Sequence, residues 1–399
     1  MTKRQTGTYE VTTTAGETVK AFVPAALPPT APPLAVEGAL PERLRTAETA
    51  LARLELASAM VPSIDWFVYG YVRKEAVVSS QIEGTQATLV DLLNFEAQST
   101  KEKPSEDVEE ICNYLDAIKY ARAQLHSEKG PPLSMRLLND THKRLMHGVR
   151  GHTKQPGEVR KTQNWIGGSR PGNASFVPPP PQRLPQLLSD LEHFIHDDNK
   201  ALHPLLRAGL VHVQFETIHP YLDGNGRMGR LLVALLLEHW KLLSQPLLYL
   251  SAFFKQHRDE YYRRLTAVRV EGDWEGWLDF FLDGVATIAD EAASTARTLH
   301  ALVGKDRERL LKADDATVLA LRVFEVLPRK PIITVASVVA DMKTTKPAAT
   351  RAIEALIATK VLRENTGRKR DRAFAYRAYL DVLRVGTDVV AGEGRHTRK

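Results

Sequence analysis

Hydrophobic residues recur every three or four positions along most of the chain, a spacing that predicts amphipathic helices. The clearest case begins at Glu106, where Val108, Ile111, Leu115 and Ile118 share one face. Ser105 is expected to cap this helix, because its hydroxyl can accept from a free N–H of the first turn. Further helical stretches are predicted at 41–60, 64–78, after Pro132, and at 184–195, 205–215, 228–240, 247–254, 258–265, 274–282 and 284–302. The pattern predicts a mainly α protein.

The helical pattern stops between 148 and 181, a segment rich in glycine and proline. Two short β-prone pieces, 164–166 and 175–177, flank a Gly/Pro/Asn turn, which predicts a β-hairpin. A loop-rich excursion of this length in a helical protein is often functional.

The two ends of the chain differ from the helical body. Residues 1–40 are polar and then proline-rich, which predicts an extended arm packed along the body. Residues 304–315 are charged and poor in apolar residues, which predicts a hinge. We therefore divide the chain into an N-terminal arm with a helical region (1–105), a central domain (106–303) and a hinge with a C-terminal domain (304–399).

The C-terminal domain shows helices at 317–327 and 335–342 and a third that Thr344 to Pro347 would cap. Two alternating stretches, 361–363 and 373–376, flank a basic turn. Helix-turn-helix followed by a basic hairpin resembles a winged helix. DNA contact through 330–377 and a solvated wing on a protein-interaction module both stay open.

Composition limits the class of protein. The chain is 43% hydrophobic and 26% charged, as is usual for a globular protein. The single cysteine, Cys112, cannot form an internal disulfide, which favours a reducing compartment, and we expect it to be buried and inert. We find neither a run of membrane-spanning length nor a hydrophobic signal at 1–10, so we expect a cytoplasmic protein without membrane contact.

The positive charge is concentrated at the C-terminus. The net charge is +6, and residues 361–399 alone carry ten Lys/Arg against five Asp/Glu. The basic balance therefore concerns the C-terminal domain and indicates little about the central one.

Twelve consecutive residues, His219 to Arg230, connect the helical stretch at 205–215 to the apolar helix that follows. Side chains leave the backbone N–H groups of Gly224, Asn225 and Gly226 uncovered, and the helix start adds its partial positive charge. This segment predicts an anion cradle suited to phosphate.

Charged side chains accompany the predicted cradle. Arg227 and Arg230 fall on one face of the first helical turn and can bind further phosphate oxygens. Asp223 can carry Mg²⁺ through one carboxylate, with phosphate oxygens completing the shell. His219 can take a proton near neutral pH. The combination favours a phosphoryl- or nucleotidyl-transfer site over a simple turn before a helix.

These twelve residues resemble the signature of the Fic family, His-Pro-Phe-x-Asp/Glu-Gly-Asn-Gly-Arg-x-x-Arg, with Tyr221 in place of phenylalanine. The resemblance covers most of 60–300. It implies a Fic-type helical core with a β-hairpin flap and an N-terminal helical extension. The likeness of 320–385 to a winged helix is separate and adds a C-terminal domain to this fold. The resemblance to the Fic family further implies ATP and Mg²⁺ as cofactors, with His219 as the base and Asp223 as the metal ligand.

Residues 79–84 read Ser-Ser-Gln-Ile-Glu-Gly at the end of a helical stretch. By itself this is a solvated glutamate at a helix end. Beside the signature, Ser79, Glu83 and Gly84 resemble the inhibitory motif of the family, Ser/Thr-x-x-x-Glu-Gly/Asn, whose glutamate pairs with the second signature arginine, here Arg230. An arginine held by a carboxylate cannot receive the γ-phosphate, so ATP binds with its α-phosphate turned away from in-line attack.

Two more assignments follow from the resemblance alone. The family uses the segment matching 148–181 as a flap that binds a target backbone by strand addition, which places Ile166 and Gly167 in the flap. The first tyrosine of a tandem pair, here Tyr261, lies near the adenine in the family, whereas the sequence alone fits a core position equally well. Val270 stands where some relatives have a nucleotide-contacting asparagine, which leaves the base preference open.

The resulting hypothesis is a protein adenylyltransferase that moves AMP from ATP to a Ser, Thr or Tyr hydroxyl of a target protein and is autoinhibited by Glu83. The main alternative is a nucleotide-sensing transcription regulator without transfer activity, acting through the basic C-terminal domain. Within enzymes, phosphate transfer and AMP removal are the alternatives, and the Asn225-Gly226 pair favours AMP transfer. The sequence does not identify the target protein. The chain could be its own target, and it could form a homodimer.

Overall fold

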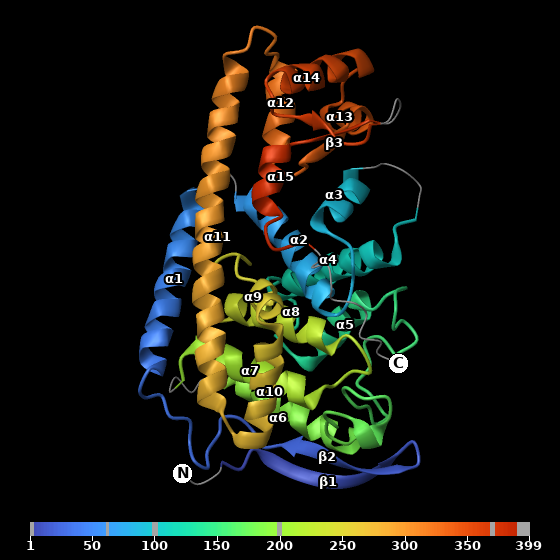
Figure 1. Cartoon of the computed structure of the whole chain (residues 1–399), viewed down its shortest axis with the longest axis vertical. Helices are drawn as coiled ribbons and strands as arrows, with labels where there is room; N and C mark the ends of the chain where they lie inside the picture. Colours follow the sequence, from blue (N-terminus) through green and yellow to red (C-terminus); the bar gives the residue numbers. More distant parts are fainter. Residues whose placement is uncertain (1–3, 61–63, 98–102, 198–201, 368–371, 389–399) are drawn as a thin grey trace.

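The computed structural model describes residues 4–60, 64–97, 103–197, 202–367 and 372–388, and helices dominate it (Figure 1). The mainly α prediction is confirmed. Within these ranges, no helix is both long enough and apolar enough to cross a membrane.

Two helices run side by side along the molecule, α1 (Leu40–Met60) and the long α11 (Trp274–Leu311) (Figure 1). Ion pairs tie their solvent sides together, from Arg53 of α1 to Asp290 of α11 at 2.8 Å. Helix α11 also passes through the predicted hinge, which is therefore helical as far as Leu311. The charged residues there still leave a buried stripe that includes Asp306 and Leu310, and this stripe holds the helix against the C-terminal domain.

The central helices surround two that are almost wholly buried, α7 (Pro204–Ile218) and α8 (Asn225–His239). Ser105 caps α4 as predicted, since its hydroxyl accepts from the Val108 N–H at 3.4 Å. The other helices of this region are α2 (Ile64–Ile82), α3 (Leu89–Ala97), α4 (Glu106–Leu125), α5 (Met135–Leu145), α6 (Leu184–His196), α9 (Ser251–Gln256) and α10 (Arg258–Glu271). Cys112 is only partly buried, and burial raises the pKa of its thiol to about 11.

The N-terminal segment is not simply an extended arm. It forms an antiparallel hairpin of β1 (Gly7–Thr14) and β2 (Glu17–Pro24), with Thr14 opposite Glu17 across a turn in which Ala15 and Gly16 have positive φ. The prediction was wrong here because the polar, threonine-rich residues concealed a period-two pattern. The hairpin packs below the central helices, and β2 buries Val19 and Ala21 (Figure 1).

The predicted hairpin at 164–177 is reduced to one bridge, between Ile166 and Phe176. A 3₁₀ turn, Pro171–Asn173, lies between the two sides. The four prolines at 178–181 follow directly, and because proline has no N–H they cannot extend the ladder. The second side is instead supported by the N-terminal hairpin, since the Phe22 N–H donates to the Val177 carbonyl at 2.9 Å.

The C-terminal region contains a three-stranded antiparallel sheet in the order β3-β5-β4 and four helices. Thr345 caps α14 as predicted. This order of elements fits the expected winged helix, but that identification and DNA contact stay predictions, and 368–371 at the basic turn lie outside the described residues. The elements are α12 (Val318–Val326), β3 (Ile332–Thr334), α13 (Val335–Met342), α14 (Lys346–Ala358), β4 (Arg363–Glu364), β5 (Ala373–Ala375) and α15 (Arg377–Leu383).

Helix α15 and the residues after it return to α2, a contact that the sequence analysis does not anticipate (Figure 1). Leu383 lies so close to Gly70 that a Cβ there would sit 2.9 Å from its Cδ1. Further along, Gln81 of α2 donates to the Thr387 carbonyl at 2.9 Å. The segment 383–387 is thus attached to the helix that carries Ser79.

Candidate active site

The predicted loop lies between α7 and α8. Helix α7 ends at His219, which has a left-handed φ of 51°, and α8 starts after Gly224, which has a φ of 77°. A non-glycine residue in this region costs about 1–2 kcal/mol, so the surroundings must hold His219 in place. The His219 N–H donates to the Phe215 carbonyl, and the His219 carbonyl accepts from Nε of Arg160, both at 2.9 Å.

Asn225 and Tyr221 close the loop. The Asn225 amide accepts from the Tyr221 N–H at 2.9 Å and donates to the Tyr221 carbonyl at 2.8 Å. Tyr221 is fully buried, and its hydroxyl donates to Asn139. Tyr221, which replaces the phenylalanine of the signature, therefore anchors the loop. Since the Asn225 side chain is engaged in this way, only its backbone can contribute to the cradle.

His142 supports the loop from below, and the sequence analysis missed it. Its ring stacks on Tyr221 at 3.8 Å between centroids. Nδ1 accepts from the Gly157 N–H, so the proton lies on Nε2, which donates to the Asp223 carbonyl at 2.9 Å. Burial lowers the pKa of His142 to about 4, which keeps the ring neutral.

Arg160 joins the loop to the flap. It is 1% exposed and donates to three further carbonyls, those of Thr162, Pro179 and Ile218. The backbone N–H of Arg160 also donates to the Pro220 carbonyl at 2.9 Å. One side chain thus fixes both ends of the 160–179 segment relative to the signature loop.

The structure brings Ser79 and Glu83 onto Arg230. Nε of Arg230 donates to the Ser79 hydroxyl, and Nη2 donates to both the Ser79 carbonyl and Oε1 of Glu83, all at 3.0 Å. The Arg230 side chain is 2% exposed, so these bonds are shielded from water. Gly84, with a φ of 102°, ends the segment, which a residue with a Cβ would do only under strain.

Glu83 also lies against the start of α8. A Cβ on Gly226 would collide with Oε1 of Glu83, so only glycine leaves room for this carboxylate. The N-terminus of α8 offers free backbone N–H groups and a partial positive charge. The carboxylate therefore stands at the anion cradle that the sequence predicts.

Arg227 and Asp223 flank the cradle. Arg227 is 4% exposed, its Nη2 points at Sδ of Met146 at 3.4 Å, and its Nη1 lies 3.6 Å from Oε2 of Glu110. Oδ1 of Asp223 accepts from the Gly224 N–H at 2.6 Å, while Oδ2 lies 2.7 Å from where a Cβ of Gly151 would be. Within the described ranges, no three His, Cys, Asp or Glu side chains converge as metal ligands. A cation here would depend on Asp223 and on oxygens of a bound ligand.

Tyr261 is buried in the core, and its assignment to the nucleotide site stays a prediction. It is 1% exposed, its hydroxyl shares a 2.9 Å hydrogen bond with Nε2 of His212, and its ring packs on Phe254. Nδ1 of His212 lies 3.1 Å from the Gly229 carbonyl of α8. The ring therefore supports, through His212, the helix that carries the arginines.

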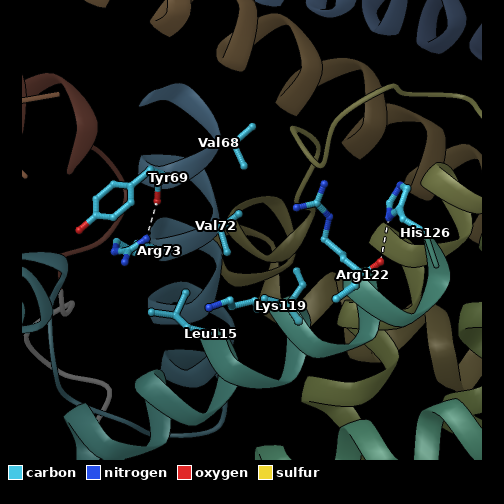
Figure 2. A pocket seen from close by; sticks show the side chains of 10 residues that line it. Val68, Tyr69, Val72, Arg73, Leu115, Lys119, Arg122 and His126 are labelled. Carbon is cyan, nitrogen blue, oxygen red and sulfur yellow. Dashed lines mark hydrogen bonds between the residues drawn. The ribbon is translucent and has the colours of Figure 1, made fainter. Parts of the chain in front are cut away.

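A separate cavity of about 440 Å³ lies between the N-terminal half of α2 and α4 (Figure 2). Val68, Val72, Leu115 and Ile118 are among its lining residues. Two of its arginines already have acidic partners, since Arg73 pairs with Glu96 and Arg122 with Glu238. None of its lining residues belongs to the signature loop, so it is distinct from the candidate active site.

Comparison with known proteins identifies two regions. The Fic/DOC family N-terminal region matches residues 42–123, and the Fic/DOC family domain matches 132–237. Among curated proteins, the chain is 30% identical over 207 residues to the protein adenylyltransferase Fic of Drosophila grimshawi and 32% identical over 184 residues to that of Culex quinquefasciatus. These matches cover 51% and 45% of this chain, but only 39% and 33% of those proteins.

Solved structures share the fold. A Fic family protein from Desulfovibrio desulfuricans G20 aligns with a TM-score of 0.55 at 19% identity, covering 86% of this chain and 97% of that one. A Fic domain containing signaling protein from Bacteroides thetaiotaomicron aligns with a TM-score of 0.51 at 16% identity, over 64% of this chain and 97% of that one.

Proposed function

Because the chain belongs to the Fic/DOC family, we propose that it is a protein adenylyltransferase held in an inhibited state by Glu83. The observation that carries this proposal is the position of the Glu83 carboxylate, which lies against Gly226 at the start of α8 and accepts from Arg230. An anionic group there indicates a site built for anions. The curated relatives that the chain matches are adenylyltransferases, although the chain spans less than two fifths of their length.

In the active state, the phosphates of ATP would occupy the cradle at 224–226, with Arg227 and Arg230 on their oxygens. Asp223 would hold Mg²⁺, which neutralises phosphate charge when bound. His219 takes the proton of the target hydroxyl, the oxygen attacks the α-phosphorus in line, and pyrophosphate leaves. The protein contributes mainly positioning and charge stabilisation.

Autoinhibition follows from the contacts of Arg230. Three of its N–H groups are engaged by Ser79 and Glu83, so it cannot also receive a γ-phosphate in the same geometry. The Glu83 carboxylate also repels a phosphate approaching Gly226. Productive ATP binding therefore requires that Glu83 leave the cradle.

The target backbone would pair along the flap at Ile166 and Gly167. The segment 175–177 has neighbours on both sides, since Phe176 forms a bridge with Ile166 and Val177 accepts from Phe22. An added strand therefore has to lie on the other side of 164–167. This arrangement would hold a target hydroxyl relative to the loop that Arg160 fixes to the flap.

The test is transfer of label from α-labelled ATP by the purified full chain. We expect weak labelling by the wild type, at least tenfold more by Glu83→Gly, and none by Glu83→Gly/His219→Ala. Mass spectrometry of the labelled species, the chain itself included, identifies the modified residue. Transfer from γ-labelled ATP instead would indicate phosphotransfer, and no transfer from either would contradict the proposal.

A further inference from the structure

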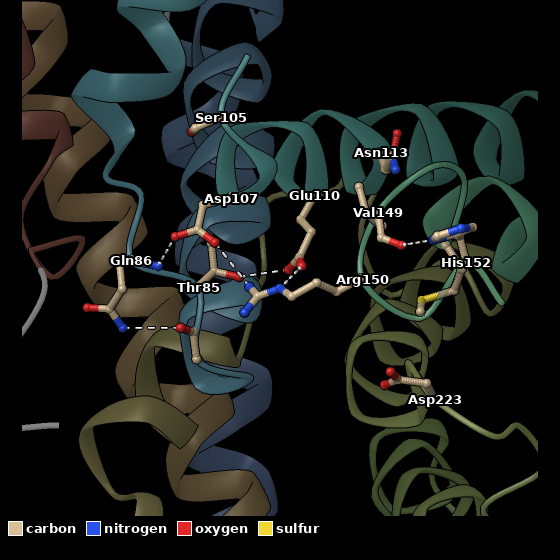
Figure 3. Close-up of polar contacts among 12 residues, drawn as sticks. Thr85, Gln86, Ser105, Asp107, Glu110, Asn113, Val149, Arg150, His152 and Asp223 are labelled. Carbon is tan, nitrogen blue, oxygen red and sulfur yellow. Dashed lines mark hydrogen bonds and ion pairs between the residues drawn. The ribbon is translucent and has the colours of Figure 1, made fainter. Parts of the chain in front are cut away.

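The turn that follows Glu83 is held by two carboxylates of α4 (Figure 3). The Thr85 hydroxyl donates to Oε2 of Glu110 at 2.9 Å, and the Gln86 N–H donates to Oδ2 of Asp107 at 2.8 Å. Arg150 lies between these carboxylates, with Nε 2.7 Å from Glu110 and Nη2 3.0 Å from Asp107. Helix α4 thus fastens the end of the inhibitory segment to the loop around Arg150.

Glu110 also faces the signature loop. It is 3% exposed, and Nη1 of Arg227 lies 3.6 Å from the same Oε2 that accepts from Thr85. A buried guanidinium loses its hydration, so Arg227 gains from the nearby Glu110 carboxylate, which also pairs with Arg150 at 2.7 Å. The one carboxylate therefore serves both the inhibitory turn and an arginine of the cradle.

The spacing between Glu110 and Arg227 is informative. At 3.6 Å the pair attracts electrostatically but is too long for a hydrogen bond. Among the described residues, Nε and Nη1 of Arg227 have no hydrogen-bond acceptor although they are buried. Buried donors are normally satisfied, so these N–H groups are available to an incoming anion. Glu110 balances the charge of Arg227 without occupying its donors.

We propose that Glu110 is a positioning residue that links the inhibitory segment to Arg227, seating the first through Thr85 and orienting the second for a phosphate. The proposal rests on the proposed function for the identity of the anion. It predicts that the two contacts of Glu110 can be separated: losing Thr85 relaxes inhibition, whereas losing the Glu110 charge impairs ATP binding even when Glu83 is absent.

The first test uses Thr85→Val, which keeps the volume and removes the hydroxyl. We expect faster amide hydrogen exchange in the peptide covering 79–86 and about fivefold more AMP transfer, the equivalent of one hydrogen bond. Thr85→Ser should restore wild-type behaviour, and Thr85→Val should add nothing to Glu83→Gly. Unchanged exchange in Thr85→Val, or full additivity with Glu83→Gly, would overturn the link.

The second test compares Glu83→Gly with Glu83→Gly/Glu110→Gln. We expect about a tenfold weaker affinity for ATP by calorimetry, a higher KM for ATP and a smaller change in kcat. The matched control is Glu83→Gly/Asp107→Asn. Asp107, like Glu110, binds Arg150 and the turn after Glu83, but it is not paired with Arg227. The affinity of this control variant for ATP should equal that of Glu83→Gly. Equal affinities in all three proteins would overturn the role of Glu110.

The outcomes separate this inference from the proposed function. The hydrogen-exchange measurement needs no nucleotide, so it tests the link between Thr85 and Glu110 by itself. If Glu83→Gly binds ATP but transfers no AMP, the proposed function is contradicted. The hydrogen-exchange comparison for Thr85→Val and the ATP-affinity comparison for Glu110→Gln would still decide the inference. AMP transfer with no effect of Thr85→Val on exchange would contradict the inference alone.

Discussion

Nη2 of Arg230 donates to the main chain of Ser79 and to the side chain of Glu83, both at 3.0 Å. Both hydrogens of one nitrogen are thereby engaged by α2 and the turn after it. The guanidinium cannot rotate toward a ligand without breaking a buried hydrogen bond, which costs about 1–3 kcal/mol. In the proposed inhibited state, this pairing is the contact through which α2 acts on the signature loop.

The variant Glu83→Gln separates the charge of Glu83 from its hydrogen bond. The amide oxygen can still accept from Arg230, but the charge that repels phosphate is lost. We expect AMP transfer between that of the wild type and that of Glu83→Gly, measured as label from α-labelled ATP. A Glu83→Gln protein as inactive as the wild type would mean that the hydrogen bond alone maintains inhibition.

Replacing Arg160 should loosen the flap. Arg160→Met retains the length of the side chain and removes the donors to four carbonyls. Several buried acceptors then lose their partners, and we expect a loss of about 3 kcal/mol in the free energy of unfolding. Urea unfolding followed by tryptophan fluorescence measures this loss. The neighbouring Lys161→Met is the control, since Lys161 is exposed, and it should change stability little.

The stability of the cradle should depend on pH through His142. Its pKa is about 4 in the folded chain against 6.5 in an unfolded one, so the unfolded state binds more protons as the pH falls. The contribution of His142 is present above pH 6.5 and is lost toward pH 4, and the loss amounts to about 2 kcal/mol at pH 5.

The variant His142→Gln checks this dependence, because glutamine does not titrate. We expect a smaller drop in the urea midpoint between pH 7 and pH 5 than in the wild type. The drop should not vanish, since burial also lowers the pKa of His212 to about 4. Identical pH dependence in both proteins would rule out His142 as a contributor.

Tyr261→Phe distinguishes the core role of Tyr261 from a role in nucleotide binding. Without the hydroxyl, Nε2 of His212 loses its partner inside the core, which should cost about 1–3 kcal/mol of unfolding free energy. The affinity of Glu83→Gly for ATP should be unchanged when Tyr261→Phe is added. A clear loss of affinity without a loss of stability would support the adenine assignment.

The sequence predicts those parts of the site that are contiguous. His219 to Arg230 carry the cradle in one segment, and the family resemblance supplies Ser79 and Glu83. The supporting residues come from distant segments, with His142 lying 81 positions from Asp223 and Arg160 59 positions from His219. Nothing local marks His142 among thirteen histidines, since its role depends on tertiary contacts alone.

The helices and strands show the same difference between features set locally and features set by distant contacts. Helices with a clear apolar stripe begin and end close to the predicted residues, because local periodicity and caps determine them. The hairpin of β1 and β2 is missed by the sequence analysis, and the one at Ile166 is shorter than predicted, because strand pairing depends on partners elsewhere in the chain. The Phe22 N–H donates to the Val177 carbonyl and so occupies the backbone edge that a peptide could have joined. No local sequence pattern reveals this contact.

The contact of Thr387 with Gln81 bears on how the protein should be produced. A shortened version that stops before α15 would lack Leu383, which packs against Gly70 of α2. It would also lack the Thr387 carbonyl, which accepts a hydrogen bond from Gln81 of α2. In the proposed inhibited state, such a version is expected to show a raised basal rate of AMP transfer, because α2 is held less firmly.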